Sequence, residues 1–161
     1  MSAPRFYVPQ ALHVDTRVRL PESVSHHALR VLRLPAGSPL ILFNGLGGAY
    51  PATLEVDGRQ GFAHITAFDA AEAELPGAIT LVQGIAAGDK MDWIVEKAVE
   101  LGVRTVVPVA AQRSVLRLSG ERLEKRLQHW RRIAQSACEQ CGRNRLPLVC
   151  APLSLAQWLA A

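Results

Sequence analysis

The sequence predicts a two-domain α+β protein, in which a mostly β first half is followed by an α/β second half. Three observations predict this. The first half alternates short apolar runs with turn signals. The second half alternates apolar runs with longer stretches of helical period. An acidic, small-residue stretch ending in Pro76-Gly77 lies between them and predicts a linker. We therefore expect domains over residues 1–74 and 75–161.

The first half has the pattern of a small barrel, because short strands and hairpins surround a single helix. Asn44-Gly45 and Asp57-Gly58 predict tight turns. Helical spacing over 22–34 predicts one helix with an apolar face, made by Val24, Ala28, Leu29 and Leu32. Strands are predicted over residues 5–8, 18–20, 40–43, 50–56 and 62–68.

The second half predicts a parallel sheet, because strands and helices alternate along the chain. Asp89 and Ser119 are expected to cap the first two helices, and Gly102 is expected to end the first. Three strands make a thin sheet, and a parallel sheet needs cover on both faces, so we expect this domain to be incomplete. Strands are predicted over 79–85, 105–109 and 147–150, and helices over 89–101, 119–140 and from Ser154 onward.

The composition predicts a soluble, cytoplasmic globular protein. Apolar residues make up 49% and charged residues 20% of the 161 residues, so the chain can bury a core. No apolar run approaches the roughly 18 residues of a membrane span. The first residues lack the apolar stretch of a signal peptide. We expect no membrane partner.

Basic charge is concentrated in one segment, although the net charge is only +4. Residues 113–145 hold nine basic side chains against three Glu, and most are arginines, which suit bidentate phosphate recognition. This cluster indicates a polyanion binder. A solvated helix face with Glu–Arg pairs is the alternative. The nine are Arg113, Arg117, Arg122, Lys125, Arg126, Arg131, Arg132, Arg143 and Arg145.

Two smaller polar groups lie on predicted helices. His26 and His27 point to different helix faces, so they are not expected to chelate one metal, but one of them shares a face with Arg30 and Arg33. Together these side chains predict a basic spot for RNA. Lys97 and Glu100, with Glu96 beside them, predict an exposed helical ion pair of little energy.

Two motifs suggest a nucleotide-binding or redox protein only weakly. Gly45-Leu46-Gly47-Gly48 precedes a strand, whereas a phosphate-binding loop opens a helix, so we expect a hairpin. The pair Cys138 and Cys141 lacks two further zinc ligands at suitable spacing and lies at a helix end. We expect ordinary buried cysteines and no metal.

Arg113 follows the predicted strand 105–109 by a few residues. Ligands of open α/β sheets bind beyond the carboxyl ends of the strands, which makes this arginine a candidate for gripping an anion. A structural role in the loop is the alternative.

Six stretches in this order resemble the RsmE family, ribosomal RNA methyltransferases that modify N3 of a uridine. They are Arg5–Val8, His26–Arg33, Leu42–Gly47, Lys90–Val103, Gln112–Ser114 and Ala137–Pro147.

The resemblance implies a PUA-like RNA-binding barrel followed by a SPOUT domain, an α/β fold with a trefoil knot. It also implies S-adenosylmethionine as cofactor, 16S ribosomal RNA as partner and a homodimer. Family members continue with a Gly-Pro-Glu-Gly-Gly loop and a Leu-Gly-x-Arg-Ile-Leu-Arg segment, which carry most cofactor contacts. Neither is found in this sequence, so no cofactor residue is assigned.

The resemblance also places residues near the reaction. Uridine N3–H must lose its proton, and arginines can stabilise the charge that develops on the uracil carbonyls. By resemblance we expect Arg113, Gln140 and Arg143 near the cleft, with Glu139 as a weaker candidate base. A hydrogen-bond network at the helix end is the alternative for Glu139 and Gln140. The residues expected to bind RNA are Arg5, His26, Arg30, Arg33, Arg131 and Arg145.

Two functions fit these patterns. The first is a methyltransferase that lacks its cofactor-binding knot, so that the 161-residue chain alone shows negligible methyl transfer. The second is a non-catalytic RNA-binding module made of the barrel and the basic helix, whose RNA binding would depend on salt.

Overall fold

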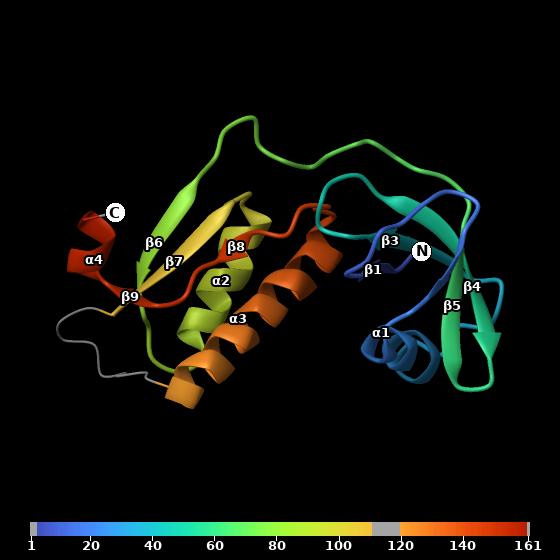
Figure 1. Ribbon diagram of the computed structural model, residues 1–161, viewed down its shortest axis with the longest axis horizontal. Coiled ribbons are helices and arrows are strands. Elements are labelled where there is room, and N and C mark those ends of the chain that lie inside the picture. Colours follow the sequence, from blue (N-terminus) through green and yellow to red (C-terminus); the bar gives the residue numbers. More distant parts are fainter. Residues whose placement is uncertain (1–2, 111–119, 161) are drawn as a thin grey trace. The chain divides into compact units, whose positions relative to one another are not determined.

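A computed structural model describes residues 3–110 and 120–160 of the chain (Figure 1). The fold divides into two compact units. The first comprises Met1–Ala73 together with Gly142–Arg145, and the second comprises Glu74–Cys141 and Leu146–Ala161. The chain therefore passes from one unit to the other three times. The sequence patterns did not indicate that four residues beyond α3 (Gly120–Cys141) belong to the first unit.

The first unit is built on a five-stranded sheet in the order β1-β3-β4-β5-β2. β1 and β3 are parallel, and the other neighbours are antiparallel. The predicted strands are present, although the last ends at Ile65 rather than 68, after which pairing resumes only at the Ala49–Asp69 bridge. The strands are β1 (Arg5–Tyr7), β2 (Arg17–Arg19), β3 (Pro39–Phe43), β4 (Tyr50–Asp57) and β5 (Gln60–Ile65).

The predicted helix over 22–34 is shorter and changes its geometry. It begins as α1 (Glu22–His26) and continues as one π-helical stretch, η1 (His27–Val31), in which the Leu32 amide donates to the His27 carbonyl. Val24 and Ala28 are buried as predicted, but Leu32 is exposed because the helix ends before it. Arg33 then adopts a left-handed φ of 53°, which turns the chain toward β3.

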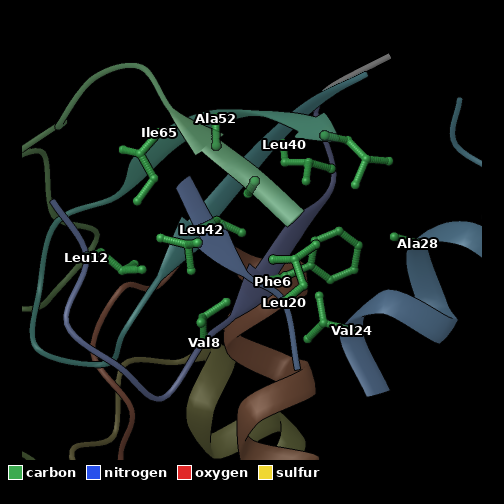
Figure 2. Packing of buried hydrophobic residues seen from close by; sticks show 13 residues of the cluster. Phe6, Val8, Leu12, Leu20, Val24, Ala28, Leu40, Leu42, Ala52 and Ile65 are labelled. Carbon is green, nitrogen blue, oxygen red and sulfur yellow. The ribbon is translucent and has the colours of Figure 1, made fainter. Parts of the chain in front are cut away.

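One apolar core lies between this helix and one face of the sheet (Figure 2). Alternate residues of β5 are buried, as expected for a strand with one face in a core. Figure 2 shows Val24 of the helix facing Phe6 and Leu20. The fully buried members include Val8, Leu40, Leu42, Leu54 and Ile65.

The second unit has the predicted parallel sheet, in the order β6-β7-β8. A short fourth strand, β9, also pairs with β7 farther along and was not predicted. Figure 1 shows α2 and α3 side by side, and they pack against each other. The elements are β6 (Thr80–Gly84), α2 (Lys90–Glu100), β7 (Thr105–Ala110), α3, β8 (Leu148–Val149), β9 (Leu153–Ser154) and α4 (Leu155–Leu159).

The helix ends of this unit confirm some of the predicted caps. Ser154 caps α4 with a complete capping box, and Gly102 follows α2 with a φ of 88°. Asp89 lies at the N-cap of α2, but its side chain makes no capping hydrogen bond, so that prediction is wrong. Its backbone is already helical (φ −74°, ψ −6°), whereas a capping residue needs an extended backbone. Ser119 lies outside the described residues.

In the described ranges, no helix has both the length and the apolar character that a membrane span requires.

Candidate functional site

The predicted basic spot on the first unit is exposed. His26, Arg30 and Arg33 all lie on the surface of the short helix or directly after it. The edge of the His27 ring contacts Phe6, with ring centroids 5.7 Å apart, so the two adjacent histidines have different surroundings. The spot therefore presents the exposed guanidinium groups of Arg30 and Arg33, which are of the kind that bind phosphates.

Arg5 lies against the Gly142–Arg145 segment. Its Nη2 donates to Asn144 Oδ1 at 2.5 Å and to the carbonyl of Gly142 at 3.3 Å. The Asn144 amide in turn donates to the Ala71 carbonyl at 2.9 Å. Arg5 thus has a structural role in the first unit, and its predicted contact with RNA phosphates stays a prediction.

The glycine loop between β3 and β4 is the hairpin that its sequence predicted. Because its glycines carry no side chain, the Gly142–Arg145 segment can approach this loop closely. A Cβ on Gly47 would collide with the Arg145 guanidinium and the Glu72 carboxylate. Arg145 Nε lies 3.3 Å from Glu72 Oε1, which also accepts the Gly48 amide at 2.9 Å. Arg145 is therefore paired with an acid on its own unit, and its RNA contact stays a prediction.

A groove of about 390 Å³ runs between α2 and α3 in the second unit. Beside it, His129 Nε2 lies 2.7 Å from Asp92 Oδ2, while the buried Trp130 indole donates to Asp92 Oδ1 at 3.1 Å. The sequence patterns did not single out this cluster, because Asp92 lies 37 residues before His129 and 38 before Trp130. The groove is lined by Glu96, Glu100, His129, Arg132, Ile133, Ser136, Ala137 and Gln140.

The predicted ion pair on α2 is a cluster of three side chains. Lys97 Nζ donates to Glu96 at 2.8 Å and to Glu100 at 2.9 Å. The hydrogen bond and charge of Lys97 lower the pKa of Glu96, and the hydrogen bonds to both carboxylates raise the pKa of Lys97. The three side chains are 35–44% exposed, so solvent screens the pairs and they contribute little to stability, as predicted.

Of the four predicted catalytic residues, three lie in the described part of the chain, and they differ in exposure. Gln140 is exposed and lines the groove, whereas the neighbouring Glu139 is half-buried and accepts a hydrogen bond from Gln135 at 3.2 Å. Arg143 belongs to the first unit and is only 2% exposed. An arginine that binds a substrate in a cleft would be expected to be more exposed. Arg113 lies outside the described residues. The catalytic roles of all four stay predictions.

Each half of the chain matches a known protein family. A family model described as an RNA methyltransferase domain matches residues 73–161, more than half of the chain. A second, described as an RNA methyltransferase PUA domain, matches residues 20–65 of the first unit. The chain belongs to this RNA methyltransferase family.

Solved structures resemble this family member over nearly its whole length. A ribosomal RNA small subunit methyltransferase E from Neisseria gonorrhoeae, bound to S-adenosylmethionine, superimposes with a TM-score of 0.93 at 42% identity. The match covers 98% of this chain and 65% of that one. A Legionella pneumophila protein described as a methyltransferase, solved with the same cofactor, superimposes with a TM-score of 0.95 at 32% identity, covering 99% and 66% of the two chains.

The chain also resembles the ribosomal RNA small subunit methyltransferase E of Bacillus subtilis, with 31% identity over 125 residues. That match covers 77% of this chain and 49% of the relative. The chain thus spans about half the length of this curated relative and about two thirds of the two solved ones.

The methyltransferase domain carries the basic helix, and α3 uses its cations in two ways. Lys125 pairs with Glu121 at 2.7 Å, and Arg131 Nε donates to the Val149 carbonyl at 3.4 Å. Arg122 and Arg132 are exposed and make no hydrogen bond or ion pair with any residue in 3–110 or 120–160. Some basic side chains of α3 are therefore paired within the protein, whereas others are exposed and unpaired among the described residues. The RNA contact of Arg131 stays a prediction.

No residue of the groove between α2 and α3 is assigned to S-adenosylmethionine. Four of its lining side chains are charged groups or an imidazole, namely Glu96, Glu100, His129 and Arg132. No step of a reaction is therefore assigned to a cofactor in it.

The three cysteines of the domain form no disulfide with any residue that the structure describes. Cys138 is buried, Cys150 is partly buried and Cys141 is exposed, so the prediction of buried cysteines is wrong for Cys141. Among the described residues, no three His, Cys, Asp or Glu side chains gather in a way that could hold a metal ion.

Proposed function

We propose that this chain provides the RNA-binding domain and part of the methyltransferase domain of an enzyme that methylates N3 of a uridine in 16S ribosomal RNA. The observation that carries the proposal is the likeness of both units, over 98% of the chain at 42% identity, to the Neisseria gonorrhoeae enzyme. The PUA match over residues 20–65 supports an RNA substrate.

S-adenosylmethionine is the proposed methyl donor, since two similar structures contain it. The SPOUT knot, the closed barrel, the homodimer and a cytoplasmic location are further parts of the proposal, which rest on the family resemblance.

The proposed roles of the chain's residues concern the RNA. Arg113 and Gln140 would bind the uracil carbonyls, where negative charge develops when N3 loses its proton. Glu139 is the candidate base, since it is a carboxylate on the same helix turn as Gln140. Arg143 is proposed to act indirectly, because its burial in the first unit suits a residue that holds the turn after α3 in place.

The test is methyl transfer from labelled S-adenosylmethionine to small ribosomal subunits that lack the modification. The enzyme would be this chain joined to the part of the Neisseria gonorrhoeae protein that the match leaves uncovered, with the unjoined chain as control. We expect labelled N3-methyluridine in the nucleoside digest. RNA binding without transfer would instead support the non-catalytic module, and methyl on another base would contradict the proposed position.

A further inference from the structure

The tip of the β4–β5 hairpin presents one arginine on a rigid turn. The ladder between the strands closes at the Asp57–Gln60 pair, so Gly58 and Arg59 alone form the loop. Gly58 has a φ of 59°, and the φ of Arg59 is not positive, which is the pattern of a type II′ turn. This turn matches the twist of the flanking strands, so the backbone of Arg59 is well fixed.

Hydrogen bonds tie the same tip to the neighbouring helix. Gln60 Nε2 donates to the Leu20 carbonyl and to Ser25 Oγ, both at 2.9 Å. The Gly61 amide donates to the same Ser25 hydroxyl at 3.2 Å, and Ser25 is buried. The hairpin tip and α1 therefore form one rigid surface, and Arg59 loses little backbone freedom when it binds a ligand.

Two surface cavities meet at Arg59. The first, about 620 Å³, lies between the tip and the start of α1 and also includes Arg19 and Glu22. The second, about 340 Å³, lies between the tip and η1 and also includes Arg30 and Leu34. Arg59 thus lies on the boundary of both cavities, with one further arginine in each.

The arginines that line the two cavities have charges that no acidic side chain of the described residues pairs with. Arg19, Arg30 and Arg59 are exposed, and none makes a hydrogen bond or ion pair with another residue that the structure describes. Arg17 is different, since its guanidinium pairs with Glu55 at 2.7 Å and lies 3.6 Å from the centroid of the Phe62 ring.

Two acidic side chains lie near the three arginines. Glu22 lines the larger cavity, and Asp57 directly precedes the tip. His26 lies four residues from both Glu22 and Arg30, on the same side of the helix. The positive charge of the surface is therefore reduced but not cancelled.

We propose that this surface binds the phosphate backbone of RNA, with Arg59 between Arg19 and Arg30. The inference rests on the proposed function, which supplies an RNA ligand. Guanidinium groups suit phosphate oxygens, and a row of unpaired arginines matches a chain that carries one phosphate per nucleotide. Arg30 and Arg59 also fall within the PUA match. The sequence patterns singled out neither Arg19, which ends the short strand β2, nor Arg59, which lies in a turn.

The test is RNA binding by the whole chain, measured by fluorescence anisotropy with a labelled single-stranded oligonucleotide between 50 and 200 mM salt. We expect Arg59→Gln to weaken binding about fivefold and to reduce the slope of log affinity against log salt by about 0.7, the value for one phosphate on a single strand. Arg59→Lys, which keeps the charge but loses the planar fork, should retain the slope with a smaller loss of affinity.

The matched control is Arg104→Gln, which removes another exposed arginine that lines neither cavity. It should leave the affinity and the slope unchanged. Unchanged binding and slope in Arg59→Gln would overturn the inference and leave the proposed function standing, since the RNA would then run elsewhere.

Two further outcomes would also overturn the inference. An equal loss of binding to polyglutamate would mean a general anion surface rather than an RNA site. Absence of RNA binding by the unaltered chain would remove the site altogether, while methyl transfer by the joined enzyme would still decide the proposed function separately.

Discussion

Asp92 links the two long helices of the second unit at the scale of a single residue. Its carboxylate lies on the first turn of α2 and accepts a hydrogen bond from the indole of Trp130 on α3. Trp130 is fully buried, so its indole N–H depends on an acceptor within the protein. A buried donor that loses its partner keeps its full desolvation cost.

We therefore predict that Asp92→Ala lowers the free energy of unfolding by about 1–3 kcal/mol. Asp92→Asn should cost less, because its amide oxygen can still accept from the indole. Urea unfolding followed by tryptophan fluorescence measures both. As a control, Glu124→Ala removes an exposed carboxylate from α3 and should change stability by no more than about 0.5 kcal/mol. Equal losses in Asp92→Ala and Glu124→Ala would show that the indole does not depend on Asp92.

At the scale of the element, two glycines end the two long helices in the same conformation but in different surroundings. Gly102 after α2 has a φ of 88°, and Gly142 after α3 has a φ of 86°. A Cβ on Gly102 would lie 2.7 Å from Leu75 Cδ1, whereas a Cβ on Gly142 would meet nothing within 4 Å. The pair therefore separates backbone strain from crowding.

We expect Gly142→Ala to cost about 1–2 kcal/mol, the strain of a left-handed alanine, and Gly102→Ala to cost about 1–3 kcal/mol more. Unfolding free energies in a double-mutant cycle with Leu75→Ala test the cause. The extra cost of Gly102→Ala should largely disappear once Leu75 is shortened. If it persists in that background, Leu75 is not the source of the crowding.

At the scale of the whole molecule, the turn after α3 belongs to a unit whose other residues come from the start of the chain. Asn144 is 3% exposed and lies between Arg5 and the Ala71 carbonyl. Losing its side chain would remove one acceptor of Arg5 and the amide that donates to the Ala71 carbonyl. A change near the end of the sequence should therefore destabilise the first unit.

We predict that Asn144→Ala lowers amide hydrogen-exchange protection in β1 and β3 by about 1–3 kcal/mol and leaves α2 nearly unchanged. Gln140→Ala, four residues earlier on an exposed position of α3, should leave protection in β1 and β3 as it was. A loss confined to the second unit after Asn144→Ala would mean that the turn does not stabilise the first.

The sequence by itself determined most helices and strands, because their signals are local. The period of apolar residues located α2 and α3, Gly102 and Ser154 marked helix ends, and the Gly45–Gly48 loop was recognised as a hairpin. The order of strands and helices was enough to predict the parallel sheet. Six ordered stretches pointed to the RNA methyltransferase family, which the family match over residues 73–161 confirms.

Only the tertiary structure decided which distant residues meet. The pairing of Asp92 with His129 and Trp130, the burial of Arg143 and the packing of Arg145 against Gly47 depend on contacts between residues far apart in sequence. Neither propensity nor periodicity reports such contacts. The same holds for Arg59, whose place between two cavities follows from a turn and a helix that are adjacent only in the folded chain.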